Sequence, residues 1–220
     1  MTEMAVIFLH GFASSNQGQK AKHLREAFQQ VDSSTLWAIN FNPTPLDFEH
    51  MTITGMINRL RQFVLERDLE QVHLIGSSMG ALVALHYGRI YSVERNLLVA
   101  PLLYYQSLGM SDEVVSWWEK RGTVEIDHYA FPGQLPLAYT FHVDGLQYED
   151  VIPPPAPTQI IHGWNDEQVA IEDSRFYAEK YPRLVDLKEV DSDHRLADQL
   201  DVIWNAVESF LLIEATGEEE

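Results

Sequence analysis

The chain has 220 residues, 45% of them hydrophobic and 22% charged, a balance typical of one soluble globular domain and not of a disordered chain. Its 33 Asp and Glu against 15 Lys and Arg give a formal net charge of −18, which argues against nucleic-acid or anionic membrane partners. The absence of cysteine excludes disulfides, a thiol nucleophile and thiolate metal sites.

The sequence contains no apolar stretch long enough to predict a membrane span. A signal peptide is not expected either, because Met1 to Glu3 lead directly into a strand pattern. We therefore expect a cytoplasmic protein with no stable membrane association. The length favours a single domain over residues 1–220.

The first part of the chain alternates between strand and helix patterns. Met4–Leu9 is apolar throughout, as parallel strands are when helices cover both faces. A helix is predicted over Gln19–Gln30 and a second strand over Ser34–Ile39. After Pro45 the sequence predicts one long helix, whose apolar face carries Ile53, Met56, Ile57, Leu60 and Val64.

The next strand pattern ends in the sequence Gly76-Ser77-Ser78-Met79-Gly80 and continues into an apolar helix. Such a turn holds its central serine at the carboxyl edge of the sheet, so Ser78 is the candidate nucleophile. Gly-x-Ser-x-Gly also arises by chance as a plain structural turn. Its place between a strand and a helix favours the chemical interpretation.

A long insertion interrupts the alternation after the strand Asn96–Ala100. Residues 102–151 are rich in aromatic side chains and contain a predicted hairpin, Thr123–Val143. We expect a cap or lid over the site, although additional core packing explains the same composition. Three tryptophans are predicted to line an apolar acyl pocket: Trp117, Trp118 and Trp164.

The alternation then resumes with two strands, a helix between them and a helix after them. The strand Thr158–Ile161 ends near Asp166, and a helix is predicted over Glu167–Glu179. The strand Leu184–Val190 ends near His194, and the last helix is predicted over Asp198–Ile213. The strand and helix order predicts an α/β fold with about six mostly parallel strands flanked by helices.

A serine nucleophile needs a base and an acid that orients the base. His194 and Asp166 follow consecutive strands, so they are the predicted base and acid. Asp191 and Asp193 compete for the acid role, but a carboxylate so close in sequence to the histidine rarely reaches its far ring nitrogen. Of the other histidines at strand ends, His10 precedes the loop expected to hold an oxyanion, and His162 is expected to hold the acid turn.

The oxyanion needs two backbone N–H donors, which we assign to Phe12 and Met79. No His-x-x-x-His or clustered carboxylate pattern indicates a metal site.

Four stretches together resemble the α/β-hydrolase superfamily, and especially the small YqiA-like bacterial esterases. They are His10-Gly11-Phe12-Ala13-Ser14-Ser15, Gly76-Ser77-Ser78-Met79-Gly80, His162-Gly163-Trp164-Asn165-Asp166 and Ser192-Asp193-His194. The resemblance implies a hydrolase of carboxylic esters or thioesters that uses Ser78, Asp166 and His194 and needs no cofactor. The chain lacks the first two antiparallel strands of larger relatives, and Val169-Ala170 stands where many relatives have Val-Pro.

The expected partner is a small acyl ester or thioester, cleaved through an acyl-enzyme intermediate. An acyltransferase with the same residues and a non-catalytic binding protein on a hydrolase scaffold are the alternatives. Small neutral or apolar esters are expected to be favoured. The net charge should disfavour strongly anionic substrates, unless a local cation such as Lys120, Arg121 or Arg195 meets them.

Overall fold

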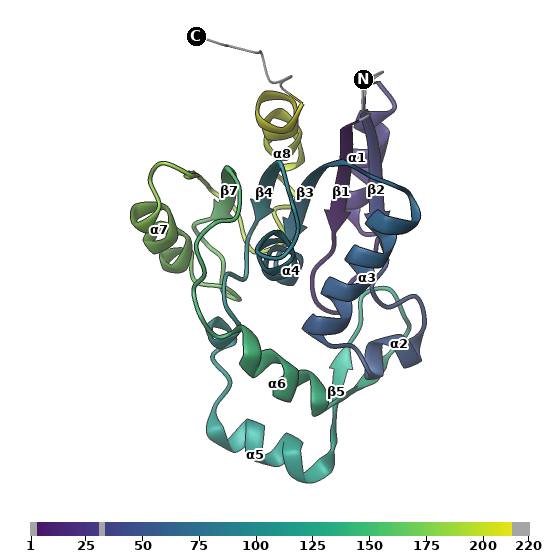
Figure 1. Cartoon of the computed structure of the whole chain (residues 1–220). Helices are drawn as coiled ribbons and strands as arrows, with labels where there is room; N and C mark the ends of the chain where they lie inside the picture. Colours follow the sequence, from purple (N-terminus) through teal and green to yellow (C-terminus); the bar gives the residue numbers. More distant parts are fainter. Residues whose placement is uncertain (1–3, 31–33, 213–220) are drawn as a thin grey trace.

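A sheet of six parallel strands, in the order β2-β1-β3-β4-β7-β8, forms the centre of the molecule (Figure 1). The computed structural model describes residues 4–30 and 34–212. The strands are Met4–Leu9 (β1), Ser34–Ile39 (β2), Gln71–Ser77 (β3), Arg95–Val99 (β4), Thr158–Gly163 (β7) and Val185–Val190 (β8). The predicted α/β fold with a six-stranded sheet is confirmed.

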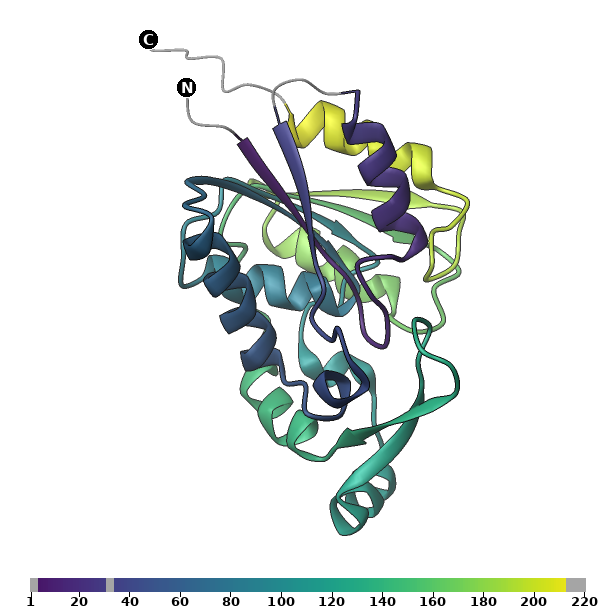
Figure 2. The ribbon, with the colours of Figure 1, turned by 90° about the vertical axis from the view of Figure 1, so that its right-hand side faces the viewer.

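Helices cover both faces of the sheet, which explains why β1 is apolar at every position. Val6 and Phe8 pack into one buried cluster with α1 and α8, whereas Ile7 and Leu9 pack into another with α3 and α4. Figure 2 shows α1 (purple) and α8 (yellow) together on one side of the sheet. The helices are Gln19–Phe28 (α1), Pro45–Glu49 (α2), Ile53–Glu66 (α3), Met79–Gly88 (α4), Ile171–Lys180 (α7) and Leu200–Ala206 (α8).

Strands β1 and β3 are neighbours, but the chain leaves them toward opposite faces. β1 continues to α1 on one face and β3 continues to α4 on the other. The connections diverge at the carboxyl ends of these strands and open a crevice, where α/β sheets bind their ligands.

Residues 102–151 lie beyond the carboxyl ends of the strands, in the lower part of Figure 1. The segment contains Tyr105–Leu108 (η1), Asp112–Arg121 (α5), Thr123–Asp127 (β5), Gln134–Ala138 (β6), Thr140–Gly145 (α6) and Leu146–Tyr148 (η2). It contacts the loop after β1, because the Tyr129 N–H donates to the Ala13 carbonyl at 2.9 Å and the rings of Phe141 and Phe12 lie 5.6 Å apart. Trp118 and Phe141 belong to a core cluster, and Tyr129 lines the cavity beside Ser78, so the segment contributes both to the core and to the wall of that cavity.

Two predicted helices differ from the observed ones because side chains bind backbone N–H groups. The long helix predicted after Pro45 is α3, which begins only at Ile53 because the Thr52 hydroxyl accepts from Gly55 N–H at 2.9 Å, and the short α2 precedes it. The helix predicted from Glu167 begins only at Ile171, because the Asp166 carboxylate binds the preceding N–H groups.

Other predicted boundaries also shift. The hairpin ends at Ala138 and is followed by α6, and α1 ends at Phe28. The last helix starts at Leu200 and passes into a π-helix over Val207–Leu211. Ile213, its predicted end, lies outside the described residues. None of the described helices is both long and apolar enough to cross a membrane.

Candidate active site

Ser78 occupies the sharp turn between β3 and α4, with φ 53° and ψ −119°. A serine rarely adopts this left-handed conformation, which costs about 1–3 kcal/mol. The turn is held by bonds from Ser78 N–H to the Val99 carbonyl and from Ala81 N–H to the Ser78 carbonyl, both 2.9 Å. A Cβ on Gly80 would lie 2.2 Å from the Leu9 carbonyl oxygen, so only glycine lets the helix approach β1 this closely.

The structure brings Ser78, His194 and Asp166 into one hydrogen-bond chain. His194 Nε2 lies 3.0 Å from Ser78 Oγ, and His194 Nδ1 lies 2.7 Å from Asp166 Oδ2. An ionised carboxylate only accepts, so Nδ1 carries the proton and Nε2 is left to accept from the serine hydroxyl. This is the tautomer that a general base requires.

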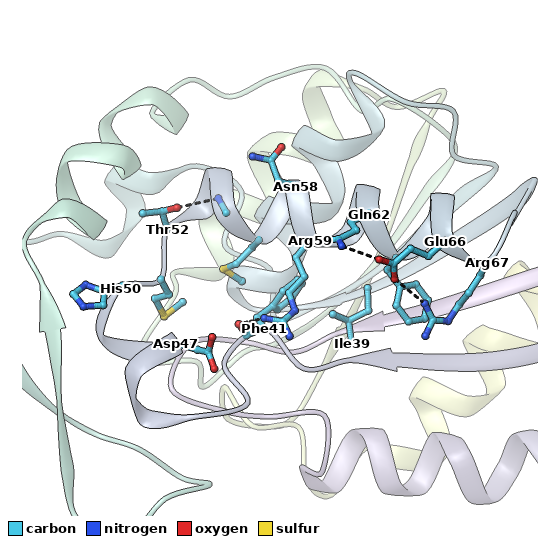
Figure 3. Close-up of a pocket in the computed structure, with 14 residues that line it drawn as sticks. Ile39, Phe41, Asp47, His50, Thr52, Asn58, Arg59, Gln62, Glu66 and Arg67 are labelled. Atoms are coloured by element: carbon cyan, nitrogen blue, oxygen red, sulfur yellow. Dashed lines mark hydrogen bonds and ion pairs between the residues drawn. The ribbon is translucent and has the colours of Figure 1, made fainter.

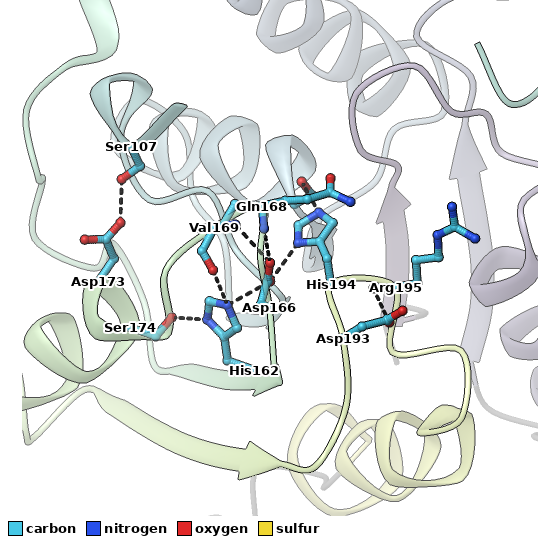
Figure 4. Close-up of polar contacts among 11 residues, drawn as sticks. Ser107, His162, Asp166, Gln168, Val169, Asp173, Ser174, Asp193, His194 and Arg195 are labelled. Carbon is cyan, nitrogen blue, oxygen red and sulfur yellow. Dashed lines mark hydrogen bonds and ion pairs between the residues drawn. The ribbon is translucent and has the colours of Figure 1, made fainter. Parts of the chain in front are cut away.

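Asp166 has four hydrogen-bond donors around its buried carboxylate. Its Oδ1 accepts from the N–H groups of Gln168 and Val169 at 2.9 Å each, and its Oδ2 accepts from His194 and His162 (Figure 4). Burial alone would raise the pKa of Asp166, but the bonds from His162, His194 and Val169 outweigh it and hold this pKa well below the usual range. Asp166 is therefore ionised at neutral pH.

The two competing aspartates make other contacts. Asp193 Oδ1 accepts from the backbone N–H of Arg195 at 2.8 Å, and Asp191 Oδ1 accepts from the Asn165 amide at 2.9 Å. Neither has a bond to the His194 ring in the described part of the chain. The geometry thus favours Asp166 as the partner of His194.

His162 is fully buried behind Asp166. Its Nε2 faces Asp166 Oδ2 at 3.0 Å and the Val169 carbonyl at 3.2 Å, both acceptors, so this nitrogen carries the proton. Its Nδ1 then accepts from the Ser174 hydroxyl at 2.7 Å. His162 holds the acid turn, as the sequence predicted, and it also donates directly to the carboxylate, a contact that the sequence did not reveal.

The loop after β1 lies against the nucleophile. A Cβ on Gly11 would lie 3.1 Å from the Ser78 Cβ, and the backbone N–H groups of Phe12 and Met79 have no hydrogen-bond partner within residues 4–30 and 34–212. Met79 is also the first residue of α4, where the positive end of the helix dipole adds to its N–H. Both predicted donors are thus free to bind an oxyanion at Ser78.

His10 fixes this loop to the segment that follows the neighbouring strand β2. Its Nδ1 donates to the Gly11 carbonyl at 2.8 Å, and its Nε2 accepts from Phe41 N–H at 3.0 Å. Burial lowers the pKa of His10 to about 4, so the ring is neutral and can accept.

A cavity of about 540 Å³ opens beside Ser78 and His194. Its walls come from the loop after β1, the start of α1, the hairpin of the insertion, and the residues after Asp166 and His194. The lining includes Phe12, Ser14, Lys20, Tyr129, Gln168 and Arg195.

The three predicted pocket tryptophans do not line this cavity. Trp118 faces the core, where its Nε1–H donates to the Leu137 carbonyl at 3.0 Å. Trp117 is on the exposed side of α5 with Arg121 over its ring, and Trp164 is 54% exposed. The role of the three tryptophans in lining an acyl pocket stays a prediction, and the lining of this cavity does not support it. Adjacent positions on a helix point in different directions, so Trp117 and Trp118 do not share one wall.

A second cavity, of about 640 Å³, lies between the end of β2 and helices α2 and α3 (Figure 3). Its lining includes His50, Arg59, Gln62 and Arg67, and none of the three residues of the hydrogen-bond chain. The Gln62 amide and Arg67 both contact Glu66 there, at 2.7 Å and 3.7 Å. No described group of three His, Asp or Glu residues in the molecule is arranged to hold a metal ion.

Solved structures of similar shape have low sequence identity to this chain. A protein from Agrobacterium vitis S4 has a TM-score of 0.81 and 20% identity, over 94% of this chain and 87% of its own. Est1E from Butyrivibrio proteoclasticus, with ferulic acid bound, has a TM-score of 0.78 and 17% identity over 96% and 89%. Mouse alpha/beta hydrolase domain-containing protein 10 has a TM-score of 0.77 and 19% identity over 94% and 89%.

Among the curated proteins there is no match. The model of UPF0227, described as an uncharacterised protein family, matches residues 5–211, which is nearly the whole chain. The chain therefore belongs to the UPF0227 family and has the α/β-hydrolase fold.

Proposed function

We propose that this protein is a serine hydrolase that cleaves carboxylic esters or thioesters through an acyl-enzyme intermediate. The observation that carries the proposal is the hydrogen-bond chain from Asp166 through His194 to Ser78, with bonds of 2.7 Å and 3.0 Å. The two unbonded N–H groups beside Ser78 support it, because an acyl transfer needs a site for the oxyanion.

In the first half of the reaction, Ser78 Oγ attacks the acyl carbon and His194 Nε2 takes the hydroxyl proton. The carbonyl oxygen becomes negative and is bound by the N–H groups of Phe12 and Met79. The bond to the leaving alcohol or thiol then breaks, and His194 gives its proton to that group. Asp166 stays ionised throughout and stabilises the imidazolium.

In the second half, water attacks the acyl-enzyme while His194 takes one of its protons. The tetrahedral intermediate collapses, Ser78 Oγ regains the proton from His194, and the carboxylic acid leaves. None of these steps uses a cofactor.

Covalent labelling tests the proposal. A neutral fluorophosphonate should label the wild-type protein at Ser78, because His194 activates the hydroxyl and the oxyanion donors bind the phosphonyl oxygen. Ser78→Ala should abolish both labelling and ester hydrolysis while circular dichroism shows an intact fold. Ester hydrolysis that survives in Ser78→Ala at the wild-type rate would refute the assignment.

A further inference from the structure

Two cations without a carboxylate partner line the cavity that contains the candidate nucleophile. Lys20 and Arg195 line the cavity that contains Ser78. The Lys20 ammonium donates to the Arg195 backbone carbonyl at 2.5 Å, and the Arg195 guanidinium lies 5.5 Å from the centre of the Tyr129 ring. Within residues 4–30 and 34–212, no carboxylate oxygen lies at ion-pair distance from either group.

The nearby aspartates have other partners or lie at the rim. Asp166 is occupied by two imidazoles and two backbone N–H groups, and Asp193 accepts from the backbone of Arg195. Asp127, on the exposed hairpin, contributes a negative charge to the cavity lining. Figure 4 shows Arg195 on the opposite side of His194 from Asp166.

Burial dominates the environment of Lys20. It lowers the pKa of Lys20 to about 8, against the attraction of Asp193 and Asp166 and with the repulsion of Arg195. The ammonium is therefore charged at pH 7, and the Lys20 side chain is only partly buried, so it stays accessible to an anion in the cavity.

The start of α1 adds positive potential at the same place. Residues Gly18 to Ala21 line the cavity, and this helix has no side-chain cap and no acidic residue in its first turn. The residues that carry the first N–H groups of α1 and the positive end of its dipole therefore line the same cavity as the Lys20 side chain.

We propose that this cavity is an anion subsite, and that the preferred substrates are esters or thioesters with a carboxylate or phosphate close to the scissile bond. The inference rests on the proposed serine hydrolase function. It corresponds to the exception stated from the sequence, in which a local cation such as Arg195 offsets the unfavourable net charge. Of the cations named from the sequence, Arg195 is at the site, whereas Lys120 and Arg121 do not line the cavity.

Paired substrates test the inference at pH 7 in a pH-stat. Monomethyl glutarate against methyl pentanoate places the anion on the acyl side. On the alcohol side, 3-acetoxypropanoate and 2-acetoxyethyl phosphate, each against propyl acetate, separate a carboxylate from a phosphate. At low salt we expect kcat/KM to be about tenfold higher for the anionic member of at least one pair, and this preference should shrink at 0.5 M NaCl.

Single substitutions show which cation produces the preference for anionic esters. Lys20→Met should lower the anionic-to-neutral ratio of kcat/KM about tenfold, and Lys20→Arg should retain most of it. Arg195→Gln, at an exposed position that tolerates replacement, should lower the ratio about fivefold. Lys22→Met removes the same charge from an exposed position of α1 outside the cavity and should leave the ratio unchanged.

The outcomes separate the inference from the function on which it rests. Equal kcat/KM within every pair, or a ratio unaffected by both Lys20→Met and Arg195→Gln, would overturn the anion subsite. If the anion subsite is overturned but Ser78 is still required for hydrolysis of the neutral esters, the proposed serine hydrolase function stands without the anion subsite. If no ester of either kind is hydrolysed, both proposals fall.

Discussion

Replacing the buried acid is the most informative single change, because an amide has the shape of a carboxylate but different hydrogen bonding. In Asp166→Asn the amide oxygen can keep the bonds that Oδ1 accepts from Gln168 and Val169 N–H. The amide NH₂ then takes the place of Oδ2 and presents donors to His194 and His162, where the wild type presents an acceptor.

His194 must respond by losing its Nδ1 proton. The proton then resides on Nε2, 3.0 Å from Ser78 Oγ, where the imidazole can no longer accept the serine proton. The base is lost although every heavy atom stays near its place. We expect kcat for ester hydrolysis to fall about 10⁴-fold, which corresponds to about 5 kcal/mol of transition-state stabilisation.

Asp193→Asn is the matched control. An asparagine oxygen can still accept from Arg195 N–H, as Asp193 Oδ1 does at 2.8 Å, and no contact to the His194 ring is lost. Steady-state kinetics on a neutral ester should show less than about a threefold change. Equal losses in the two variants, or full activity in Asp166→Asn, would refute the assigned acid.

Three further changes test the support of the site. His162→Phe removes a donor to Asp166 and should lower kcat about tenfold with little effect on KM. His162→Gln can still donate, so its kcat should fall less. Initial rates on a neutral ester measure both variants. Gly80→Ala should destabilise the fold by more than about 3 kcal/mol in urea unfolding, because its Cβ meets a β1 carbonyl at 2.2 Å, whereas Gly18→Ala, with 3.5 Å of clearance, should be tolerated. The pKa of His10 falls from 6.5 to about 4 on folding, so protonation of this ring favours the unfolded chain. The free energy of unfolding should therefore decrease as the pH falls from 6.5 to about 4. A urea midpoint that stays constant over this pH range would contradict this expectation.

The strands and the positions of the candidate catalytic residues at strand ends could be predicted, because both follow from local patterns. Uninterrupted apolar runs identify buried parallel strands such as β1, and their carboxyl ends meet at one edge of the sheet. Ser78, Asp166 and His194 each follow such an end, so the topology alone brings them near one another. Their hydrogen-bond distances then depend on loop conformations that a pattern does not specify.

Features that depend on side-chain direction or on distant contacts were not predictable. The sequence contains Trp117 and Trp118 as an aromatic pair, but only the fold determines that Trp118 faces the core and Trp117 faces solvent. The start of α7 does not follow from the sequence pattern, because the Asp166 carboxylate binds N–H groups that a helix would otherwise use. The position of Lys20 beside the candidate site does not follow from the sequence, because Lys20 contacts the carbonyl of Arg195, which is 175 positions away in the chain.

The proposed anion subsite implies that the net charge of −18 does not by itself set the potential at Ser78. Net charge sums over the whole surface, and at physiological salt each exposed charge is screened over about 8 Å. The potential at Ser78 therefore depends on the few groups that line its cavity. Lys20, Arg195 and the start of α1 are among them, and Asp166 is already surrounded by donors. An acidic surface limits which macromolecules approach the protein. Cations that line a cavity act on the small substrate bound there. A protein can therefore repel polyanions and still select an anionic ester.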